Sequence, residues 1–598
     1  MKADLKHTPL GYFIFFYREM GNKLIFNIFL ATTLGLLDGV GLALFIPLLQ
    51  FVNDAPGIAT GESMGGLRFI FDGFSRIGIP INLFSVLIFM VFIFSIKGLL
   101  NYWLSMEQVD LRQKYMVKLR LGQIKQLQQL SYQGFLTLDA GKIQNAITAE
   151  VGKNLQAMIQ FLATTKAAIV LVAYIMLAFL ANWQFALFIM VGCILSNLIY
   201  RRIIESVKIS SIEISKRGNL FNGFMIQCLH HFKYLRATGY FKQYAVKLQS
   251  VINEVENLNR KIGRNQAITA STREPIIIFI VAVVILVQIT YLGASLGSIL
   301  LSLLLFYRAL NGLVVVQNTW QGFMQNVGGL QAVYDLSDSL QQFKEQEITT
   351  LMPKFHSQIT LNDLYFAYGK KFALKGINLS IQKNETIALV GESGSGKSTL
   401  VNIMCALIAP TKGQLLVDGY SPDAYNINSY RAQIGYVTQE PIIFNDSVFN
   451  NVTFWAPVTA ENIFRFWEVI EKVAMRDTVD NMTQKENTLL GDNGMLISGG
   501  QKQRISIARE LYKDVELLIM DEATSALDSE TENYVQENIN QLRGAYTIII
   551  IAHRLSTIKN ADRIYLLEKG EIKGEGKFEE LIEQSKRFGR MVSLQNIQ

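Results

Sequence analysis

A glycine-rich stretch near the middle of the chain carries the residue types needed to bind phosphate. Residues 391–399 read GESGSGKST, and their glycines let the backbone bend until its N–H groups converge on an anion. Lys397 can reach the β- and γ-phosphates of a nucleotide, and the Ser398 hydroxyl can join the shell of a Mg²⁺ ion. The apolar run 386–390 predicts a buried strand before this loop, and residues 400–404 predict a helix after it. A chance glycine turn is the alternative, and the strand–loop–helix context argues against it.

Three other parts of the chain could supply further contacts to a nucleotide. Residues 497–509 contain Ser-Gly-Gly-Gln at 498–501 and continue as a helix, which predicts a second helix N-terminus that favours phosphate. Tyr368 precedes the phosphate-loop strand, and its ring could stack on an adenine, although a tyrosine at the end of a strand is usually just packed. A strand predicted at 434–439 ends in a polar side chain, Gln439.

Titratable side chains follow two more predicted strands. The apolar run 517–520 leads into Asp521, which a buried strand would deliver to Mg²⁺. Glu522 beside it could orient or deprotonate a water molecule. The strand predicted at 547–552 ends at His553. Each segment alone has an ordinary structural explanation, and it is their order and spacing that together favour a nucleotide hydrolase.

The bulk composition requires a second kind of domain beside this one. The 598 residues are 50% hydrophobic and only 18% charged, which is too apolar for a wholly soluble chain and too charged for a wholly membrane-embedded one. The apolar excess lies in roughly the first 320 residues, so a membrane domain is expected to precede a soluble one. The net charge of +7 needs no nucleic-acid partner, because the basic residues concentrate in particular loops. The three cysteines are widely spaced and match no metal-binding or disulfide pattern. The N-terminal segment is not expected to be a removable signal peptide.

Apolar stretches long enough to cross about 30 Å of hydrocarbon predict six transmembrane helices. They cover 24–52, 82–105, 157–180, 184–200, 274–293 and 297–317. The connections after the second and fourth stretches are long and rich in Lys and Arg, whereas those near 182 and 293–297 carry neither. The positive-inside rule therefore places both termini and the soluble domain in the cytosol, with the chain in the inner (plasma) membrane.

Two short amphipathic helices are expected outside these spans. Leu10, Phe13, Ile14 and Tyr17 recur at helical spacing beside basic residues, which suggests a helix lying on the inner membrane surface. A simple extension of the first span is the alternative. In the external link, apolar residues over 67–77 form one helical face, which could meet a lipid chain or pack against neighbouring spans.

Three cations fall inside the apolar spans, namely Lys97, Lys166 and Arg308. A cation at the centre of a membrane helix costs roughly 2.5–3.5 kcal/mol to insert, so such residues usually face a wet cavity or a partner. A cavity with this lining would suit a phosphate or pyrophosphate head, and Arg308 could bind it in bidentate fashion. Two alternatives would explain these cations without a substrate cavity. They could form internal ion pairs, for which Asp38 is a possible partner, or their side chains could extend along the helix to the inner membrane surface.

The motifs resemble those of the ATP-binding cassette (ABC) family over Gln358 to about Glu580. Six spans ahead of one cassette are similar to an exporter half-transporter, with a transmembrane domain at 1–340, a linker at 341–357 and the cassette at 358–598. Two positions depart from the family pattern: Ile497 stands for the usual Leu of the signature, and Asp492 for the usual Glu of the coupling loop.

The resemblance implies a role for each motif residue. ATP binding is implied for Tyr368, Gly391, Ser393, Gly394, Ser395, Gly396, Lys397, Ser398, Thr399, Gln439, Ser498, Gly499, Gly500, Gln501 and Asp528. Mg²⁺ binding is implied for Ser398, Gln439 and Asp521, and catalysis for Glu522 and His553. In this family ATP lies between the phosphate loop of one cassette and the signature of another, so a homodimer is expected.

The fused organisation is typical of exporters, which makes ATP-driven transport of an amphipathic substrate the expected function. A subfamily resemblance to bacterial lipid-linked oligosaccharide flippases rests on the 67–77 helix, residues 147–151 and Tyr307-Arg308. Multidrug, lipid or peptide export is the alternative. An ATP-gated channel is disfavoured by the intact Glu522.

Overall fold

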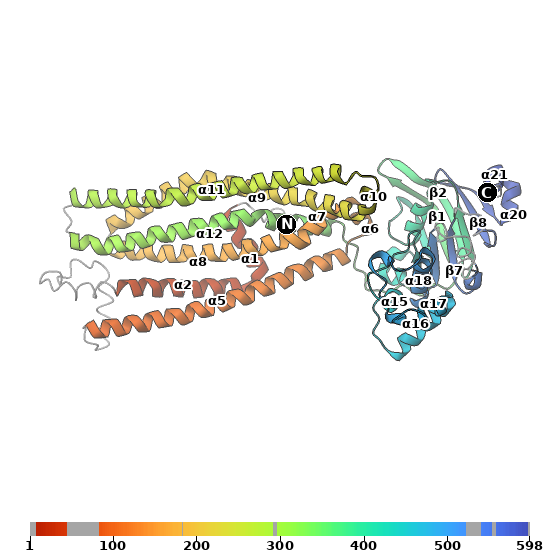
Figure 1. The fold of residues 1–598 in the computed structure, drawn as a ribbon, viewed down its shortest axis with the longest axis horizontal. Helices are drawn as coiled ribbons and strands as arrows, with labels where there is room; N and C mark the ends of the chain where they lie inside the picture. The colour runs from red at the N-terminus through yellow and green to blue at the C-terminus, as the bar shows by residue number, and fades with distance from the viewer. Residues whose placement is uncertain are drawn as a thin grey trace. The chain divides into compact units, whose positions relative to one another are not determined.

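The computed structural model describes residues 8–44, 83–181, 183–290, 296–521, 537, 540–552 and 558–595. It divides into two compact units, Met1–Lys344 and Glu345–Gln598. Long helices make up the first unit, and the second combines sheets with shorter helices (Figure 1).

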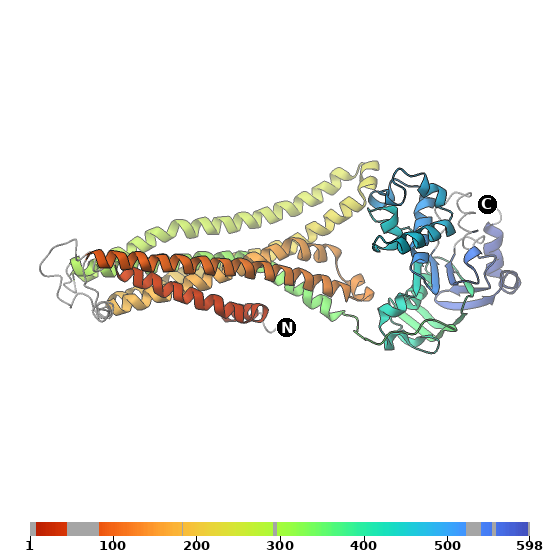
Figure 2. The same ribbon diagram turned by 90° about the horizontal axis from the view of Figure 1, so that it is seen from below.

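The first unit is helical throughout its described part, as expected for a chain that must satisfy its backbone hydrogen bonds without water. Its long helices run along a common direction, and Figure 2 shows α9 and α11, in yellow and yellow-green, running apart from the others toward α10. The elements are α1 (Pro9–Met20), α2 (Asn22–Ala43), α5 (Leu83–Gln128), α6 (Tyr132–Thr137), α7 (Ala140–Asn145), the π-helical turn η2 (Ala146–Glu150), α8 (Val151–Ala181), α9 (Trp183–His230), α10 (Phe232–Ala237), α11 (Phe241–Thr290) and α12 (Leu296–Gln342).

Four of the six expected spans are confirmed as helices long and apolar enough to cross a membrane. These helical segments are Asn22–Gly41, Leu83–Gln128, Ala140–Phe179 and Phe241–Val287, and they overlap the first, second, third and fifth expected spans. Residues 45–52 of the first expected span and 291–293 of the fifth lie outside the described residues. The fourth and sixth, at 184–200 and 297–317, fall on α9 and α12. These two stay predictions, because many of their side chains lie outside the described part of the chain.

The N-terminal amphipathic segment forms its own helix and does not extend the first span. Thr8 caps α1 by accepting a hydrogen bond from the Gly11 N–H (3.2 Å), and Gly21 ends the helix with a φ of +59°. Tyr12 and Phe16 are buried, whereas Leu10 is 68% exposed. The helix therefore presents its apolar outer face away from the bundle. The other predicted amphipathic helix, at 67–77, lies outside the described residues.

Glu150 is a fully buried carboxylate at the junction of four helical elements. It accepts hydrogen bonds from Ser215 Oγ (2.8 Å) on α9, Lys153 Nζ (2.8 Å) on α8 and Asn145 Nδ2 (3.2 Å) on α7. Asn145 in turn receives a bond from Asn222 Nδ2 (2.9 Å) of α9. This network satisfies a charge that would otherwise be costly to bury, and it joins the short helices α7 and η2 to the long ones.

Close packing of α12 against α9 depends on Gly328. A Cβ atom at this position would lie 2.3 Å from the backbone oxygen of Ser211. The Gly328 N–H donates to Ser211 Oγ (3.0 Å), and that hydroxyl donates to the Gln325 carbonyl (2.7 Å). The two helices are thus in backbone-to-backbone contact at this point.

We expect Gly328→Ala to destabilise the first unit by about 1–3 kcal/mol, because the added methyl overpacks a contact with backbone that cannot give way. The matched control is Gly263→Ala on α11, where a Cβ would meet nothing within 4 Å. That change should be neutral or stabilising by up to ~1 kcal/mol, since Ala favours a helix more than Gly does. Thermal melting of both purified variants in detergent measures the difference, and equal melting temperatures would contradict this account of the contact.

The second unit is an α/β fold built on two sheets. Five parallel strands and one antiparallel edge strand give the order β5-β6-β7-β3-β8-β9, and an antiparallel sheet has the order β2-β1-β4. The strands are β1 (Gln358–Tyr368), β2 (Lys371–Gln382), β3 (Thr386–Val390), β4 (Lys412–Val417), β5 (Ile434–Val437), β6 (Leu517–Asp521), β7 (Thr547–Ile551), β8 (Arg563–Glu568) and β9 (Glu571–Gly576).

The helices of this unit are α13 (Lys397–Met404), η3 (Pro422–Ala424), α14 (Ile427–Arg431), α15 (Val448–Thr453), α16 (Ala460–Lys472), α17 (Arg476–Asp480), η4 (Lys485–Asn487), η5 (Asp492–Gly494), α18 (Gly499–Tyr512), α20 (Phe578–Gln584) and α21 (Lys586–Gln595). Of these, α15, α16, α17, α18, α20 and α21 share a large apolar core with the parallel sheet. The strands predicted at 386–390, 434–439, 517–520 and 547–552 are confirmed as β3, β5, β6 and β7, with ends that differ by at most two residues.

Candidate nucleotide-binding site

The phosphate loop joins the buried strand β3 to helix α13. All five residues of β3 are buried between β7 and β8, which fixes where the loop begins. Gly394 and Gly396 adopt φ of +78° and +107°, a left-handed backbone that favours glycine. The side chain of Lys397 lies within the loop, where Nζ donates to the carbonyls of Gly391 (2.8 Å) and Glu392 (3.1 Å). The strand, loop and helix predicted from the sequence are all present.

A cavity of about 930 Å³ lies over this loop, which is large enough for a nucleotide. Eight of the predicted site residues line it, namely Tyr368, Ser393, Gly394, Gly396, Lys397, Ser398, Thr399 and Gln439. The structure thus brings together groups separated by up to 71 positions in the chain. Gly391 and Ser395 are buried within the loop and do not line the cavity.

Basic residues that the sequence analysis did not single out also line the cavity. They are Lys371 and Lys375, on β2, and Lys569, in the turn between β8 and β9. Hydrogen bonds hold these segments against the phosphate loop: the Gly570 N–H donates to the Ser395 carbonyl (3.0 Å), and the Lys375 N–H donates to the Gly570 carbonyl (2.8 Å). The added positive charge suits a polyphosphate. The sequence signal was the run of three lysines over 370–375 just after Tyr368.

Tyr368 is the aromatic residue of this site. Its side chain is 53% exposed at the end of β1, and its ring packs edge-on against Phe366 with centroids 4.9 Å apart. An exposed ring held in place by a second ring offers a free face for stacking. This geometry suits the adenine-stacking role expected from the sequence.

Three of the predicted site residues carry oxygen donors that suit Mg²⁺. Ser398 and Gln439 line the cavity, and Asp521 ends β6 with its carboxylate accepting a hydrogen bond from the Tyr436 hydroxyl (3.2 Å). Mg²⁺ in nucleotide sites is usually held by one or two carboxylates together with phosphate oxygens and waters. Hydroxyl, amide and carboxylate oxygens of these three residues match that donor set, and the ion would neutralise phosphate charge.

The signature segment is an exposed helix start. Ser498 caps α18 and forms a capping box with Gln501: the Gln501 N–H donates to Ser498 Oγ (3.3 Å), and the Ser498 N–H donates to Gln501 Oε1 (2.9 Å). Ser498 and Gly499 are exposed, and no residue of 498–501 lines the cavity over the phosphate loop. Within one chain, the two phosphate-binding elements therefore do not share a cavity.

A buried arginine that the sequence reasoning missed anchors this helix. Arg509 donates from Nε to the Asn451 carbonyl (2.6 Å) and lies over the rings of Phe444 and Phe454 at 5.4 and 5.2 Å. Burial lowers the pKa of its guanidinium. The contact joins α18 to α15 and so helps to fix the direction in which Ser498 points.

The three cations in the expected spans have different surroundings. Lys97 forms an ion pair with Asp38, the partner considered from the sequence, and Asp38 also accepts a hydrogen bond from the Tyr174 hydroxyl. Lys166 donates to Asn101 Oδ1 (3.0 Å). Arg308 is exposed, and no ion pair to it is found among the described residues.

Three predicted site residues, Glu522, Asp528 and His553, lie outside the described residues, so their expected roles stay predictions. The described geometry is sufficient to define a class: a P-loop nucleotide-binding domain fused to a unit of membrane-spanning helices.

Comparison with known proteins identifies the family. Residues 374–525 match the family model described as ABC transporter. The chain is 32% identical over 522 residues to the ATP-dependent lipid A-core flippase of Syntrophus aciditrophicus, covering 85% of this chain and 84% of that protein. It is 37% identical over 294 residues to multidrug resistance protein 1 of Entamoeba histolytica, covering 48% of this chain and 22% of that protein.

The chain belongs to the ABC transporter family, whose members couple ATP hydrolysis to transport. A solved structure of a bacterial Atm1-family ABC exporter with ATP bound has the same fold, with a TM-score of 0.79 at 19% identity over 97% of this chain and 99% of that one. The resemblance drawn from the motifs is confirmed.

We expect Lys371→Gln to weaken ATP binding about fivefold, because it removes a cation that lines the cavity and contributes roughly 1 kcal/mol to binding of a polyphosphate. The matched control is Lys370→Gln, an exposed neighbour that does not line the cavity. Titration of each purified variant with a fluorescent ATP analogue at low and high salt measures the effect. Equal affinities for the two variants would show that the lysines act only through the general field of the domain.

Proposed function

We propose that this protein is an ATP-driven exporter or flippase that moves an amphipathic, lipid-linked substrate from the cytosolic side of the inner membrane outward. The observation that carries the proposal is the similarity to a lipid A-core flippase, which extends over 85% of the chain and so includes the membrane helices as well as the cassette. Multidrug export is the alternative, and the multidrug relative covers only 48% of the chain.

The working unit of this proposal is a homodimer with six spans in each chain and both termini in the cytosol. Support comes from the separation of the two phosphate-binding elements, since Ser498 is exposed and does not line the cavity that contains Lys397. A second copy would bring its own signature helix to that cavity. Two composite sites would then form, each with Mg²⁺ and with Glu522 and His553 as catalytic residues.

A complementation experiment tests the composite site. Ser498→Arg places a bulky cation at the signature and Lys397→Ala removes the phosphate-loop cation, so each variant alone should lose at least nine-tenths of its ATPase activity. Co-expressed with different affinity tags and purified as the mixed dimer, the two chains should regain hydrolysis. The reason is that one site then combines an intact loop with an intact signature. A mixed dimer as inactive as its parents, despite correct folding, would overturn the composite site.

Arg308 is the leading candidate for contact with an anionic substrate head. It is exposed and has no ion pair among the described residues, whereas the charge of Lys97 is offset by Asp38 and Lys166 already bonds an amide. A desolvated guanidinium can bind a phosphate through two parallel hydrogen bonds. In a homodimer both copies could line one cavity, with Lys97 and Lys166 in subsidiary roles.

We expect Arg308→Ala to lower transport of a polyprenyl-pyrophosphate glycan or a lipid A analogue in proteoliposomes roughly tenfold or more while keeping basal ATPase activity. Arg308→Lys should recover part of the transport, because it keeps the charge without the planar fork. The matched control is Arg264→Ala, because Arg264 is an exposed arginine on α11 outside the expected span. A second control, Glu522→Gln, measures passive leak of the substrate. Normal transport by Arg308→Ala, or an uncharged best substrate, would favour a general exporter of amphipaths.

A further inference from the structure

Arg587, near the start of α21, joins the phosphate loop to the strand beside it. Its Nη2 lies 2.5 Å from Glu392 Oε1, and its Nη1 lies 3.1 Å from Glu568 Oε2. Glu392 is the second residue of the phosphate loop, and Glu568 is the last residue of β8. One side chain from the C-terminal helix therefore forms ion pairs with two carboxylates beside the nucleotide site.

The register of the parallel sheet brings these two carboxylates together. β3 and β8 pair in parallel with Val390 opposite Leu566, and Glu392 and Glu568 each lie two residues further along the chain. Two like charges at neighbouring positions repel each other, and both would repel a polyphosphate. A guanidinium has five N–H donors and can bond both carboxylates at once. Arg587 thus offsets negative charge at the edge where the phosphate loop begins.

The apolar core of the second unit fixes the position of Arg587. The next residue, Phe588, is fully buried, and its ring packs edge-on against Phe578 of α20 with centroids 5.6 Å apart. The side chains of Arg587 and Glu392 themselves are 43% and 70% exposed. Exposed ion pairs contribute little to folding stability. The effect of this pair is therefore expected in ligand binding and not in folding.

Glu392 lies close enough to the nucleotide cavity for its charge to act on a bound phosphate. It does not line the cavity, but the next residue, Ser393, does. Neighbouring Cα atoms are about 3.8 Å apart and a glutamate side chain extends roughly 5 Å, so the carboxylate lies within about 9 Å of the Ser393 Cα. The Debye length is about 10 Å at 0.1 M salt, so this charge is not screened. Glu568 likewise precedes Lys569, which lines the cavity.

We propose that Arg587 is a positioning residue of the nucleotide site, whose charge compensates Glu392 and Glu568 and so raises the affinity of the cassette for ATP. Arg587 does not line the cavity and acts through the two carboxylates. With these paired, the lysines that line the cavity attract the triphosphate without opposition from nearby negative charge. The proposal concerns nucleotide binding alone and does not depend on which substrate is transported.

Binding of a fluorescent ATP analogue to the purified full chain in detergent tests this role. At low salt, Arg587→Gln should weaken binding about fivefold, because Glu392 then repels the phosphates. Arg587→Lys should keep most of the affinity, since it keeps the positive charge. At about 1 M salt, where the Debye length is about 3 Å, the loss in Arg587→Gln should largely disappear.

Removal of the carboxylate separates compensation of charge from mechanical support of the loop. Glu392→Gln alone should bind ATP at least as tightly as the wild type, because it removes a negative charge near the phosphates. Combined with Arg587→Gln, it should restore the affinity to within about twofold of the wild type, although the ion pair is lost. A tether between α21 and the phosphate loop would give the opposite result in both variants.

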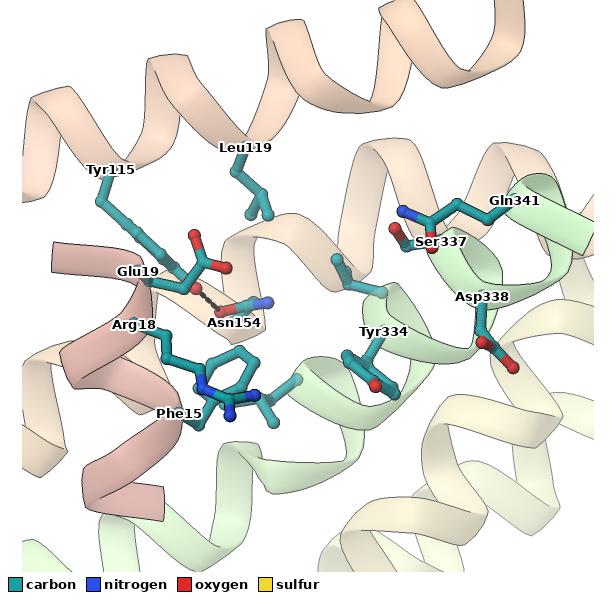
Figure 3. Close-up of a pocket in the computed structure, with 12 residues that line it drawn as sticks. Phe15, Arg18, Glu19, Tyr115, Leu119, Asn154, Tyr334, Ser337, Asp338 and Gln341 are labelled. Carbon is teal, nitrogen blue, oxygen red and sulfur yellow. Dashed lines mark hydrogen bonds between the residues drawn. The ribbon is translucent and has the colours of Figure 1, made fainter. Parts of the chain in front are cut away.

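Two control variants change exposed charges elsewhere. Arg590→Gln removes an exposed arginine of the same helix, for which no ion pair is found in the part of the chain that the structure describes. Glu19→Gln breaks an exposed ion pair with Lys118 (2.9 Å) in the first unit, where Figure 3 shows Glu19 on α1 beside a separate cavity. Both variants should bind ATP like the wild type.

Several results would overturn the proposal. Unchanged affinity in Arg587→Gln would show that the ion pairs do not influence the site, and an equal loss in Arg590→Gln would show only the general field of the helix. A double variant that binds as weakly as Arg587→Gln, or a loss that persists at high salt, would show a tether. Thermal melting separates binding from folding, since Arg587→Gln should melt within a few degrees of the wild type. A large fall in melting temperature, shared by the double variant, would show that Arg587 only stabilises α21.

Discussion

The carboxylate of Glu150 is buried completely among helices, and a buried charge is tolerated only when hydrogen bonds and an opposite charge surround it. Donors from α7, α8 and α9 meet this requirement together, and Gly329 of α12 leaves room for the group, since a Cβ there would lie 3.1 Å from Glu150 Oε2. Four elements must therefore keep one mutual arrangement. If one of these elements moves, the others must move with it. Pulling any hydrogen-bond donor away from Glu150 would leave its carboxylate poorly compensated in a low-dielectric interior.

The second unit depends on a different constraint, the common edge at which parallel strands end. β3, β6 and β7 are parallel neighbours in one sheet, so their carboxyl ends meet at the same edge. This explains why the nucleotide site could be predicted from the sequence. The phosphate loop and Asp521 each follow a short, mostly apolar run. The run and the turn residues after it are adjacent in the sequence, so both can be recognised there. Once these strands pair in one sheet, the segments that follow them are expected at the same edge, although they are far apart in the sequence.

Other parts of the site could not be predicted because they depend on contacts between distant segments. Lys569 reaches the phosphate cavity through hydrogen bonds of Gly570 to Ser395 and Lys375, and nothing local to residues 569–570 indicates that contact. Lys97, Lys166 and Arg308 looked alike in the sequence as cations in apolar helices. Helix packing gives each a different environment, an acidic partner for Lys97, an amide for Lys166 and exposure for Arg308. Which side chains pair across two helices depends on how far one helix is shifted along the other. The hydrophobic periodicity of the sequence does not determine that shift.

The capping box at Ser498 shows how one residue can serve both the fold and the proposed reaction. A serine hydroxyl has one donor hydrogen and two acceptor lone pairs. Capping α18 uses an acceptor, since the Gln501 N–H donates to Ser498 Oγ, and the Ser498 N–H is already taken by the Gln501 side chain. In the proposed homodimer, the hydroxyl hydrogen would stay available for a phosphate oxygen of the second chain's nucleotide. Stabilising the helix start and binding phosphate are thus compatible, because they use different atoms of the same side chain.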